Sequence, residues 1–299
     1  QLHNMSISKE IKDSFRFGSS LTQLIYINLA IFLIYSLVRV IMFIGGTQPG
    51  SSYAHWLAVP AGLHQLLSRP WTLLTYMFFH ENFLHILFNL LWLYWFGRLF
   101  LQHLSQRQLV GVYLMGGITG AIFFIAAYNI LPVFRAISSE AMALGASASV
   151  LAVVIAVSTL KPNNSIYILF LGEVKLKYLA LATIIIDIIS IPVSNPGGHI
   201  AHLGGAVFGF SFIKLLNRGT DLTKFLNIFS RVKKPKAHRS KNLKVSYRRP
   251  ETDYEYNRRK ANEQKSIDRI LDKIAKSGYY SLSKEEKETL FRMKNDSVN

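Results

Sequence analysis

A serine opens an apolar segment in the stretch ALGASASVLAVV, residues 143–154. Its neighbours are small, with Gly145 and Ala146 before Ser147 and Ala148 after it. Unpaired backbone N–H groups and the dipole at a helix N-terminus favour developing negative charge, which suits a serine nucleophile. On this motif alone, close packing of membrane helices through small residues explains the composition equally well.

Two histidines, His199 and His202, open a later apolar segment, GGHIAHLGGAVFGF. A histidine inside a membrane is costly and points to function. Small residues recur at every fourth position beside both polar groups, so the two backbones can approach closely. These two stripes are Ala201, Gly205 and Gly209 beside the histidines, and Ala148, Ala152 and Ala156 beside the serine. A serine facing a histidine is what acyl transfer requires, because imidazole takes the hydroxyl proton and returns it to the leaving amine.

The stretch HENFLHILFN holds two neutral donors, His85 and Asn89, four residues apart and therefore on one helical face. They suit an oxyanion site, although either could instead form an interhelical hydrogen bond. The stretch also nearly matches the H-E-x-x-H zinc motif. However, His80 and His85 are five residues apart, about 140° around a helix. A three-histidine zinc site with His199 or His202 has no carboxylate motif behind it, and we favour no metal and no cofactor.

One acid, Asp187, lies inside the apolar segment TIIIDIIS. Such an acid could orient a histidine as a third catalytic group. A bond to a neighbouring helix, or a place near the outer end of a cavity, is the favoured interpretation. We therefore leave Asp187 out of the predicted site.

The elements that must position these groups are membrane helices. Half of the 299 residues are hydrophobic, and apolar runs reach the roughly 20 residues that a bilayer requires. No cleavable signal peptide is evident before the first run, so we expect that helix to be retained. The sequence predicts an all-α membrane protein with a six-helix domain at 22–217. The six predicted spans are about 22–45, 83–101, 108–131, 146–160, 176–193 and 199–217.

The span that begins at Ser147 is short. It runs for about 14 residues to Lys161, roughly 21 Å of helix against a hydrocarbon core of about 30 Å. With Lys161 at the cytoplasmic surface, Ser147 lies on the order of 9 Å below the outer surface. The polar loop before Ser147 must then enter the membrane, where irregular backbone is tolerated only if protein buries it or water lines it. We predict a water-filled cavity, open outward, with Ser147 at its floor.

Positive charge is concentrated near the C-terminus, where residues 231–299 carry 20 of the 34 Lys and Arg. The basic residues follow the positive-inside rule if both termini, including residues 1–21, are cytoplasmic. The basic tail directly follows a membrane helix, so anionic lipid or a cytoplasmic protein is expected as its partner, and not nucleic acid. The absence of cysteine excludes disulfides, thiolate metal sites and cysteine nucleophiles.

Residues 218–257 are predicted to be a basic linker, and residues 258–299 a small cytoplasmic helical hairpin. The first helix carries an apolar face and stops at Gly278, and Ser283 with Glu286 makes a capping box for the second. The apolar face consists of Ile267, Ile270, Leu271 and Ile274.

Taken in order, these motifs resemble those of the rhomboid intramembrane serine proteases. The pattern is HxxxN at 85–89, GxSx at 145–148 and AHxxG at 201–205. The resemblance covers about residues 20–217 and implies a six-helix rhomboid fold. It implies a dyad with Ser147 as nucleophile and His202, not His199, as general base. It also implies that Asn89, His85 and the Ser147 amide bind the oxyanion.

The resemblance further implies that the substrates are transmembrane-anchored proteins within the lipid bilayer. The loop at 46–70 resembles the laterally embedded first loop of the family. The tail resembles a short C-terminal domain of rhomboid-like proteins in Bacteroidetes, which implies a bacterial inner membrane.

Two residues depart from the family pattern. Ala148 stands where the family often has Gly, and Leu151 where an aromatic ring often stacks on the histidine. These changes bear on the rate more than on the chemistry. Because both the serine and the histidine are present, we expect an active protease. The alternative is a non-catalytic adaptor that uses the same fold to bind transmembrane segments.

Overall fold

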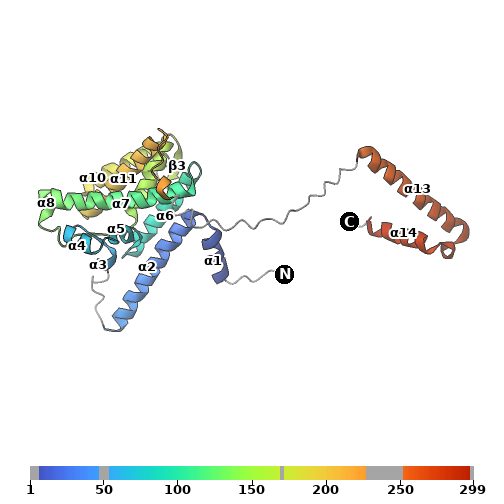
Figure 1. Ribbon diagram of the computed structural model, residues 1–299, viewed down its shortest axis with the longest axis horizontal. Coiled ribbons are helices and arrows are strands. Elements are labelled where there is room, and N and C mark those ends of the chain that lie inside the picture. Colours follow the sequence, from blue (N-terminus) through green and yellow to red (C-terminus); the bar gives the residue numbers. More distant parts are fainter. Residues whose placement is uncertain (1–6, 47–53, 169–171, 227–251, 297–299) are drawn as a thin grey trace. The chain divides into compact units, whose positions relative to one another are not determined.

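The computed structural model describes residues 7–46, 54–168, 172–226 and 252–296. The chain divides into two compact units, Gln1–Lys234 and Pro235–Asn299, and each is described by itself (Figure 1). Helices dominate both units. Four of the described helices are long and apolar enough to cross a membrane. The prediction of an all-α membrane protein is confirmed.

Six helices of the first unit coincide with the predicted spans to within a few residues. They are α2 (Ser20–Ile44), α6 (Phe83–Leu101), α7 (Gln106–Ile130), α9 (Ser147–Leu160), α10 (Leu176–Ser190) and α11 (Pro196–Leu216). Helix α1 (Ile7–Phe17) precedes them. The four long helices are α2, α6, α7 and α11. Helix α9 has only 14 residues and α10 only 15. The shortness of α9 agrees with the prediction that this helix starts inside the thickness of the membrane.

Helix α9 is the core of this unit, and every residue from Ala148 to Ser158 is buried. Helix α11 packs directly on its backbone. A Cβ atom added at Gly205 would lie 2.1 Å from the carbonyl oxygen of Ala148, and one at Gly209 would lie 2.2 Å from that of Ala152. The predicted contact between two stripes of small residues is therefore confirmed.

Helix α7 contacts α9 through glycines that the sequence interpretation did not use. A Cβ at Gly116 would lie 2.3 Å from the Ala152 Cβ, and one at Gly120 would lie 2.6 Å from the Ala148 Cβ. The Gly120 position also meets the carbonyl oxygen of Ala201 on α11 at 2.8 Å. Helix α9 is thus held by close backbone contacts with two other helices.

Polar contacts join helix ends on one side of the unit. The backbone N–H of Ser20, at the start of α2, donates to Oε1 of Gln106 at the start of α7 (2.9 Å). Arg107 forms an ion pair with Asp221, just past α11. Burial alone would raise the pKa of the Asp221 carboxyl, but hydrogen bonds from Thr223 and the charge of Arg107 hold it below its ordinary value. This contribution to stability is present at neutral pH and is lost as the pH falls through that lowered pKa.

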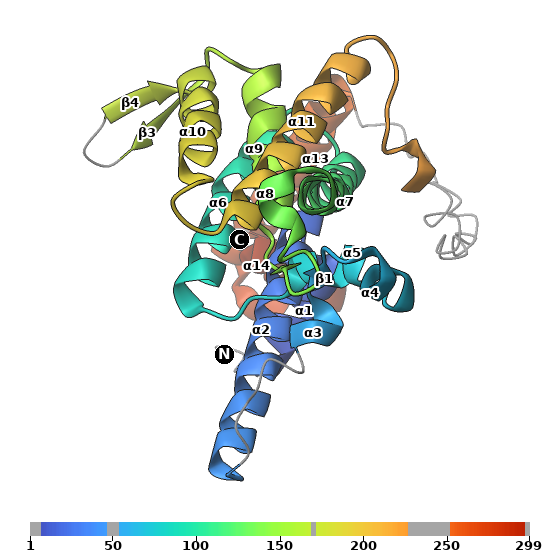
Figure 2. The same ribbon diagram turned by 90° about the vertical axis from the view of Figure 1, so that its left-hand side faces the viewer.

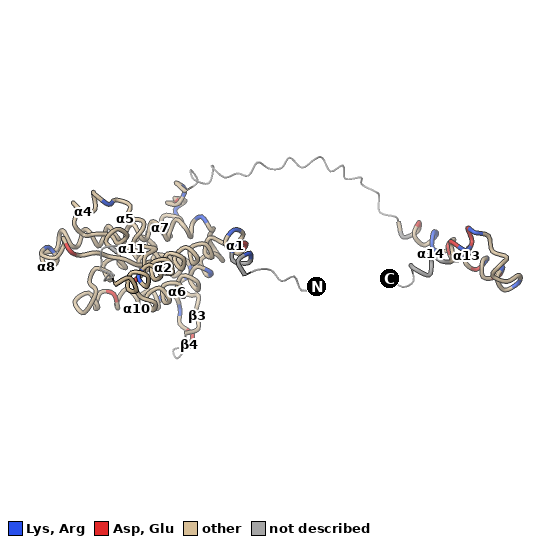
Figure 3. The backbone as a smooth tube through the Cα atoms, turned by 90° about the horizontal axis from the view of Figure 1, so that it is seen from below, with Lys and Arg blue, Asp and Glu red and all other residues tan. Residues whose placement is uncertain are grey.

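Charged side chains gather near the helix ends. Figure 3 shows long stretches of the first unit's helices without Lys, Arg, Asp or Glu. Helix α6 has a single charged residue other than histidine, Arg98, and it lies in the last turn. Helix α11 has a single Lys or Arg, Lys214, and it also lies in the last turn. This distribution is the one expected of helices that lie in a membrane.

Short elements follow α2 on the other side of the unit. They are α3 (Ala54–Leu57), β1 (Val59–Pro60), α4 (Leu63–Ser68), α5 (Thr72–Thr75) and the 3₁₀ helix η1 (Tyr76–Phe78). Residues 47–53 of the predicted interfacial loop lie outside the described residues. In the rest, the rings of Trp56 and Trp71 are stacked, and both side chains are exposed together with Leu67. An interfacial position in the headgroups remains our prediction for this segment.

Two small sheets join neighbouring elements. Helix α8 (Pro132–Arg135) follows α7, and strand β2 (Met142–Ala143) then pairs antiparallel with β1. Strands β3 (Ser165–Ile168) and β4 (Gly172–Lys175) form a hairpin between α9 and α10. Figure 2 shows this hairpin at the edge of the unit, next to α10. The 3₁₀ helix η2 (Lys224–Leu226) ends the described part of the unit.

The second unit contains α13 (Asp253–Ser277), the 3₁₀ helix η4 (Tyr279–Ser281) and α14 (Lys284–Asp296). Helix α13 starts before the predicted boundary at 258, because Thr252 and Glu255 form a capping box there. Of the predicted linker, residues 227–251 lie outside the described residues. The predicted stop at Gly278 is present, with φ of 75°.

The start of α14 also agrees with its prediction, because the Ser283 backbone donates to Glu286 (2.7 Å) and the Glu286 backbone donates to Ser283 Oγ (3.2 Å). Ile270 of the predicted apolar face is buried, whereas Leu271 is half exposed.

The contact of α11 with α9 predicts that Gly205→Ala destabilises the protein. The added methyl group would meet the Ala148 carbonyl, and overpacking of this kind costs about 1–3 kcal/mol of unfolding free energy. We expect a lower midpoint of thermal unfolding for the full chain in detergent.

Gly62→Ala is the matched control, because its methyl group would be 3.5 Å from the nearest side-chain atom and φ is −66°. Equal midpoints for the two variants would contradict the close contact.

Candidate active site

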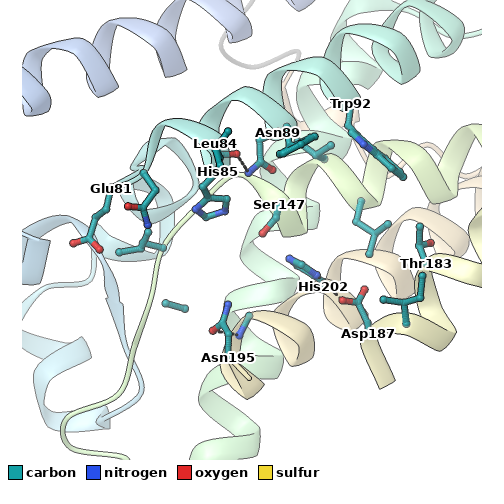
Figure 4. Close-up of a pocket in the computed structure, with 18 of the residues that line it drawn as sticks. Glu81, Leu84, His85, Asn89, Trp92, Ser147, Thr183, Asp187, Asn195 and His202 are labelled. Carbon is teal, nitrogen blue, oxygen red and sulfur yellow. Dashed lines mark hydrogen bonds and ion pairs between the residues drawn. The ribbon is translucent and has the colours of Figure 1, made fainter. Parts of the chain in front are cut away.

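A cavity of about 620 Å³ opens between α6, α9, α10 and α11 (Figure 4). Ser147 contributes to its wall from the first position of α9. The cavity thus occurs where the sequence predicted one. Its lining comprises Glu81, Asn82, Leu84, His85, Phe88, Asn89, Trp92, Met142, Ala143, Leu144, Ser147, Val150, Leu151, Thr183, Ile186, Asp187, Asn195, Gly198 and His202.

The loop before Ser147 is fixed by backbone hydrogen bonds. The N–H of Gly145 donates to the carbonyl of Tyr76 (2.9 Å), and the N–H of Ala61 donates to the carbonyl of Ala141 (2.9 Å). No side chain caps the start of α9. As at the start of any α-helix, the first N–H groups of α9 have no partner within the helix.

His80 also holds this loop, because its Nε2 accepts the N–H of Ala146 (3.3 Å). The spacing argument against a zinc motif measured the angle between His80 and His85 as if both lay on one helix, but His80 precedes α6, which begins at Phe83 as predicted. Their rings in fact lie in edge contact, with centroids 5.1 Å apart. His80 is fully buried and does not line the cavity, so its place in the structure is to support the loop.

His202 lies one turn before Gly205 on α11, and the close contact there brings its ring to the cavity opposite Ser147. Figure 4 shows the Ser147 hydroxyl and the His202 ring facing each other. His199 lies on the same helix but does not line the cavity. The structure therefore brings His202, and not His199, beside the serine.

His85 and Asn89 line the cavity from one face of α6, as their spacing predicts. The side-chain amide of Asn89 donates one hydrogen to the His85 carbonyl (2.8 Å). The amide has a second hydrogen, which can be donated to another group. The His85 ring lies against Gly145, where an added Cβ would be 2.6 Å from Cε1. Both side chains can thus present hydrogen-bond donors close to Ser147.

Asp187 has both of the positions that the sequence interpretation favoured, because it contacts a neighbouring helix and lies at the cavity. Asp187 lines the cavity from α10, and its Oδ1 lies 2.8 Å from Nδ1 of His202 and 2.8 Å from Nδ1 of His199. Only 6% of the surface of Asp187 is accessible to solvent. Asp187 therefore contacts the histidine that faces Ser147, although we left it out of the predicted site. The available signal was a lone acid in an apolar helix.

Asn195 is a second cavity residue that sequence reasoning missed. It adopts a left-handed backbone conformation with φ of 43°, and its side chain accepts the N–H of Gly198. An Asn at a helix start is a recognisable cap signal, because its side-chain oxygen satisfies an unpaired N–H group. The cap begins α11 one turn before the histidines.

One group in the described part of the chain could offer three metal ligands. Asp187, His199 and His202 have ligand atoms within 4.8 Å of one another. In a tetrahedral zinc site with bonds of about 2.0–2.1 Å, the ligand atoms are about 3.3 Å apart. The 2.8 Å separations are those of hydrogen bonds. The arrangement fits hydrogen bonding better than metal binding.

Comparison with known proteins shows that the residues of this cavity belong to a known domain family. Residues 67–219, just over half of the chain and including every cavity residue, match the family described as the Rhomboid domain. Residues 251–293 match a family of unknown function, DUF6576.

A curated relative is "RHOMBOID-like protein 12, mitochondrial" from Arabidopsis thaliana, 30% identical over 144 residues. The aligned region covers 45% of this chain and 43% of the relative, so the chain spans less than half of that protein's length.

The contact between Gly145 and His85 predicts that Gly145→Ala destabilises the site. The variant combines backbone strain, at φ of 119°, with a clash against the His85 ring. Strained backbone of this kind costs of order 1–3 kcal/mol, and the clash adds to it. We expect a clear drop in the thermal unfolding midpoint in detergent.

Gly46→Ala separates the two effects, because Gly46 has φ of 73° and no atom within 4 Å of an added Cβ. If Gly145→Ala were no more destabilising than Gly46→Ala, the packing of His85 against this loop would be refuted.

Proposed function

The chain belongs to the rhomboid family, and we propose that it is an intramembrane serine endopeptidase that cleaves transmembrane-anchored proteins. The observation that carries this proposal is the position of Ser147. Ser147 is the first residue of a buried helix. Its hydroxyl lies at a cavity between membrane helices and faces the His202 ring. A hydroxyl beside an imidazole in a water-accessible site is the arrangement of an activated nucleophile.

In the proposed reaction, the Ser147 oxygen attacks the scissile carbonyl carbon while Nε2 of His202 takes the hydroxyl proton. The carbonyl oxygen becomes an oxyanion, which Asn89, His85 and the Ser147 backbone N–H stabilise by hydrogen bonds. The C–N bond then breaks, and the amine leaves with the proton from His202. A water molecule in the cavity then attacks the carbonyl carbon of the acyl-enzyme ester while His202 takes its proton. The C–O bond to Ser147 breaks, Ser147 recovers a proton from His202, and the second product leaves as a carboxylic acid.

The two departures from the family pattern are compatible with this geometry. Ala148 is small enough to pack against Gly120 and Gly205, whose missing side chains leave room for its methyl and carbonyl groups. Leu151 lines the cavity one turn after Ser147 and can form an apolar wall. The rival proposal is a non-catalytic adaptor, which would hold transmembrane segments in the same cavity without reacting with them.

The protein is a multi-pass membrane protein. We further propose a bacterial inner membrane, six spans, and both termini in the cytoplasm. The cluster of basic residues at 231–299 supports this orientation, because positive charge is enriched in cytoplasmic segments. We propose anionic lipid or a cytoplasmic protein as the partner of this tail, and expect no nucleic acid and no cofactor.

The direct test is cleavage of a single-span model protein by the purified full-length chain in lipid vesicles. We expect Ser147→Ala and His202→Ala each to abolish cleavage, because each removes a reacting group. The unfolding midpoint of both variants should stay near that of the wild type. His199→Ala is the matched control, and it should retain substantial activity, since His199 does not line the cavity.

Cleavage that survives in Ser147→Ala would refute the serine mechanism. A folded wild type that binds transmembrane segments and cleaves none would favour the adaptor.

Asn89→Ala is expected to lower kcat by about 10²–10³ with little change in KM, because an oxyanion donor acts mainly in the transition state. Asn129→Ala is the matched control. Asn129 donates in the same way to the carbonyl four residues earlier, that of Ile125 (2.8 Å), but lies outside the cavity. A rise in KM with unchanged kcat would reassign Asn89 to substrate docking.

A further inference from the structure

The wall of the cavity opposite Ser147 contains an unusual arrangement, in which two imidazole rings share one carboxylate oxygen. Oδ1 of Asp187 lies 2.8 Å from Nδ1 of His199 and 2.8 Å from Nδ1 of His202. The carboxylate comes from α10 and both histidines come from α11. In Figure 4 the His202 ring lies between Asp187 on one side and Ser147 on the other.

The chemistry of the carboxylate decides where the histidine protons are. An ionised carboxylate only accepts hydrogen bonds, so an imidazole nitrogen in contact with it must carry a hydrogen. A neutral His202 bonded in this way has its hydrogen on Nδ1 and a lone pair on Nε2. That lone pair is what a base needs to take the proton from a serine hydroxyl.

We infer that Asp187 is a positioning residue for the proposed protease reaction, which holds His202 in the tautomer and orientation that direct Nε2 at Ser147. This inference rests on the proposed function. It extends the predicted serine–histidine pair to a chain of three groups from three helices, α9, α11 and α10. Once His202 has taken the proton, the adjacent carboxylate also stabilises the imidazolium, since opposite charges attract strongly where little water is present.

His199 has a supporting part in this arrangement. It donates to the same Asp187 oxygen from one turn earlier on α11 and does not reach the cavity. Its bond restrains the carboxylate, which is nearly buried and would otherwise have one partner fewer. The loss of His199 should therefore be milder than the loss of Asp187.

The test compares Asp187→Asn with the wild type for cleavage of a single-span protein in vesicles. An amide of the same shape can also donate to Nδ1, which allows the tautomer with the hydrogen on Nε2. We expect kcat to fall by about 10²-fold while KM changes little, because the substrate does not depend on the tautomer for binding.

Asp221→Asn is the matched control, because Asp221 is also a nearly buried, hydrogen-bonded carboxylate among the described residues of this unit, and it lies outside the cavity. It should lower the unfolding midpoint and leave kcat unchanged. If Asp187→Asn does not fold, Asp187→Glu and Asp187→Gln are compared instead. The Glu variant should be the faster of the two, and equal rates would overturn the inference.

Other outcomes are equally decisive. An unchanged kcat in Asp187→Asn, or a raised KM alone, would overturn the role of Asp187. Wild-type cleavage that is lost with EDTA and restored by Zn²⁺ would replace hydrogen bonding with metal binding. A wild-type chain that cleaves nothing would refute the proposed protease, whereas an active wild type with an equally active Asp187→Asn would refute only this inference.

Discussion

The arrangement of the site depends on one steric constraint, the close approach of three helix backbones. Helix α9 is held between α7 and α11 at distances that leave no room for a side chain at Gly116, Gly120, Gly205 or Gly209. Because His202 lies one turn from Gly205, and Ser147 lies next to Ala148, this contact places the imidazole at the serine. A methyl group at the contact would separate the two reacting groups as well as the helices.

The same constraint explains why a short helix suits this position. Helix α9 is almost wholly covered by other parts of the protein, so it does not have to be long enough to cross the hydrocarbon core of the membrane. Because the helix starts deep in the unit, the loop at 141–146 also lies inside the unit, where pairing with β1 and hydrogen bonds to Tyr76 and His80 satisfy several of its backbone groups. Unpaired polar backbone would be unstable in hydrocarbon. The serine is therefore exposed to water in a cavity while its helix remains buried.

Much of this could be predicted from the residues. The spans followed from long apolar runs, and Ser147 and the two histidines, His199 and His202, followed from polar groups at helix starts beside stripes of small residues. The choice of His202 over His199 came from the family resemblance. The α7 glycines were missed although Gly116 and Gly120 are four residues apart, which is the same signal. The contact of Asp187 with His202 could not be read from the chain, since it depends on how α10 is rotated against α11. The role of His80 was missed because it precedes α6 and acts through a backbone N–H of a distant loop.

The central claim is that Ser147 is a nucleophile activated by His202. Its most direct test is to treat the full-length protein in membranes with a fluorophosphonate and to locate the covalent adduct by mass spectrometry. The account predicts an adduct on Ser147 that is absent in Ser147→Ala and forms far more slowly in His202→Ala. Ser149, two residues later and fully buried beside Met77, should carry none. An unmodified Ser147 in folded protein, or equally fast modification without His202, would contradict the claim.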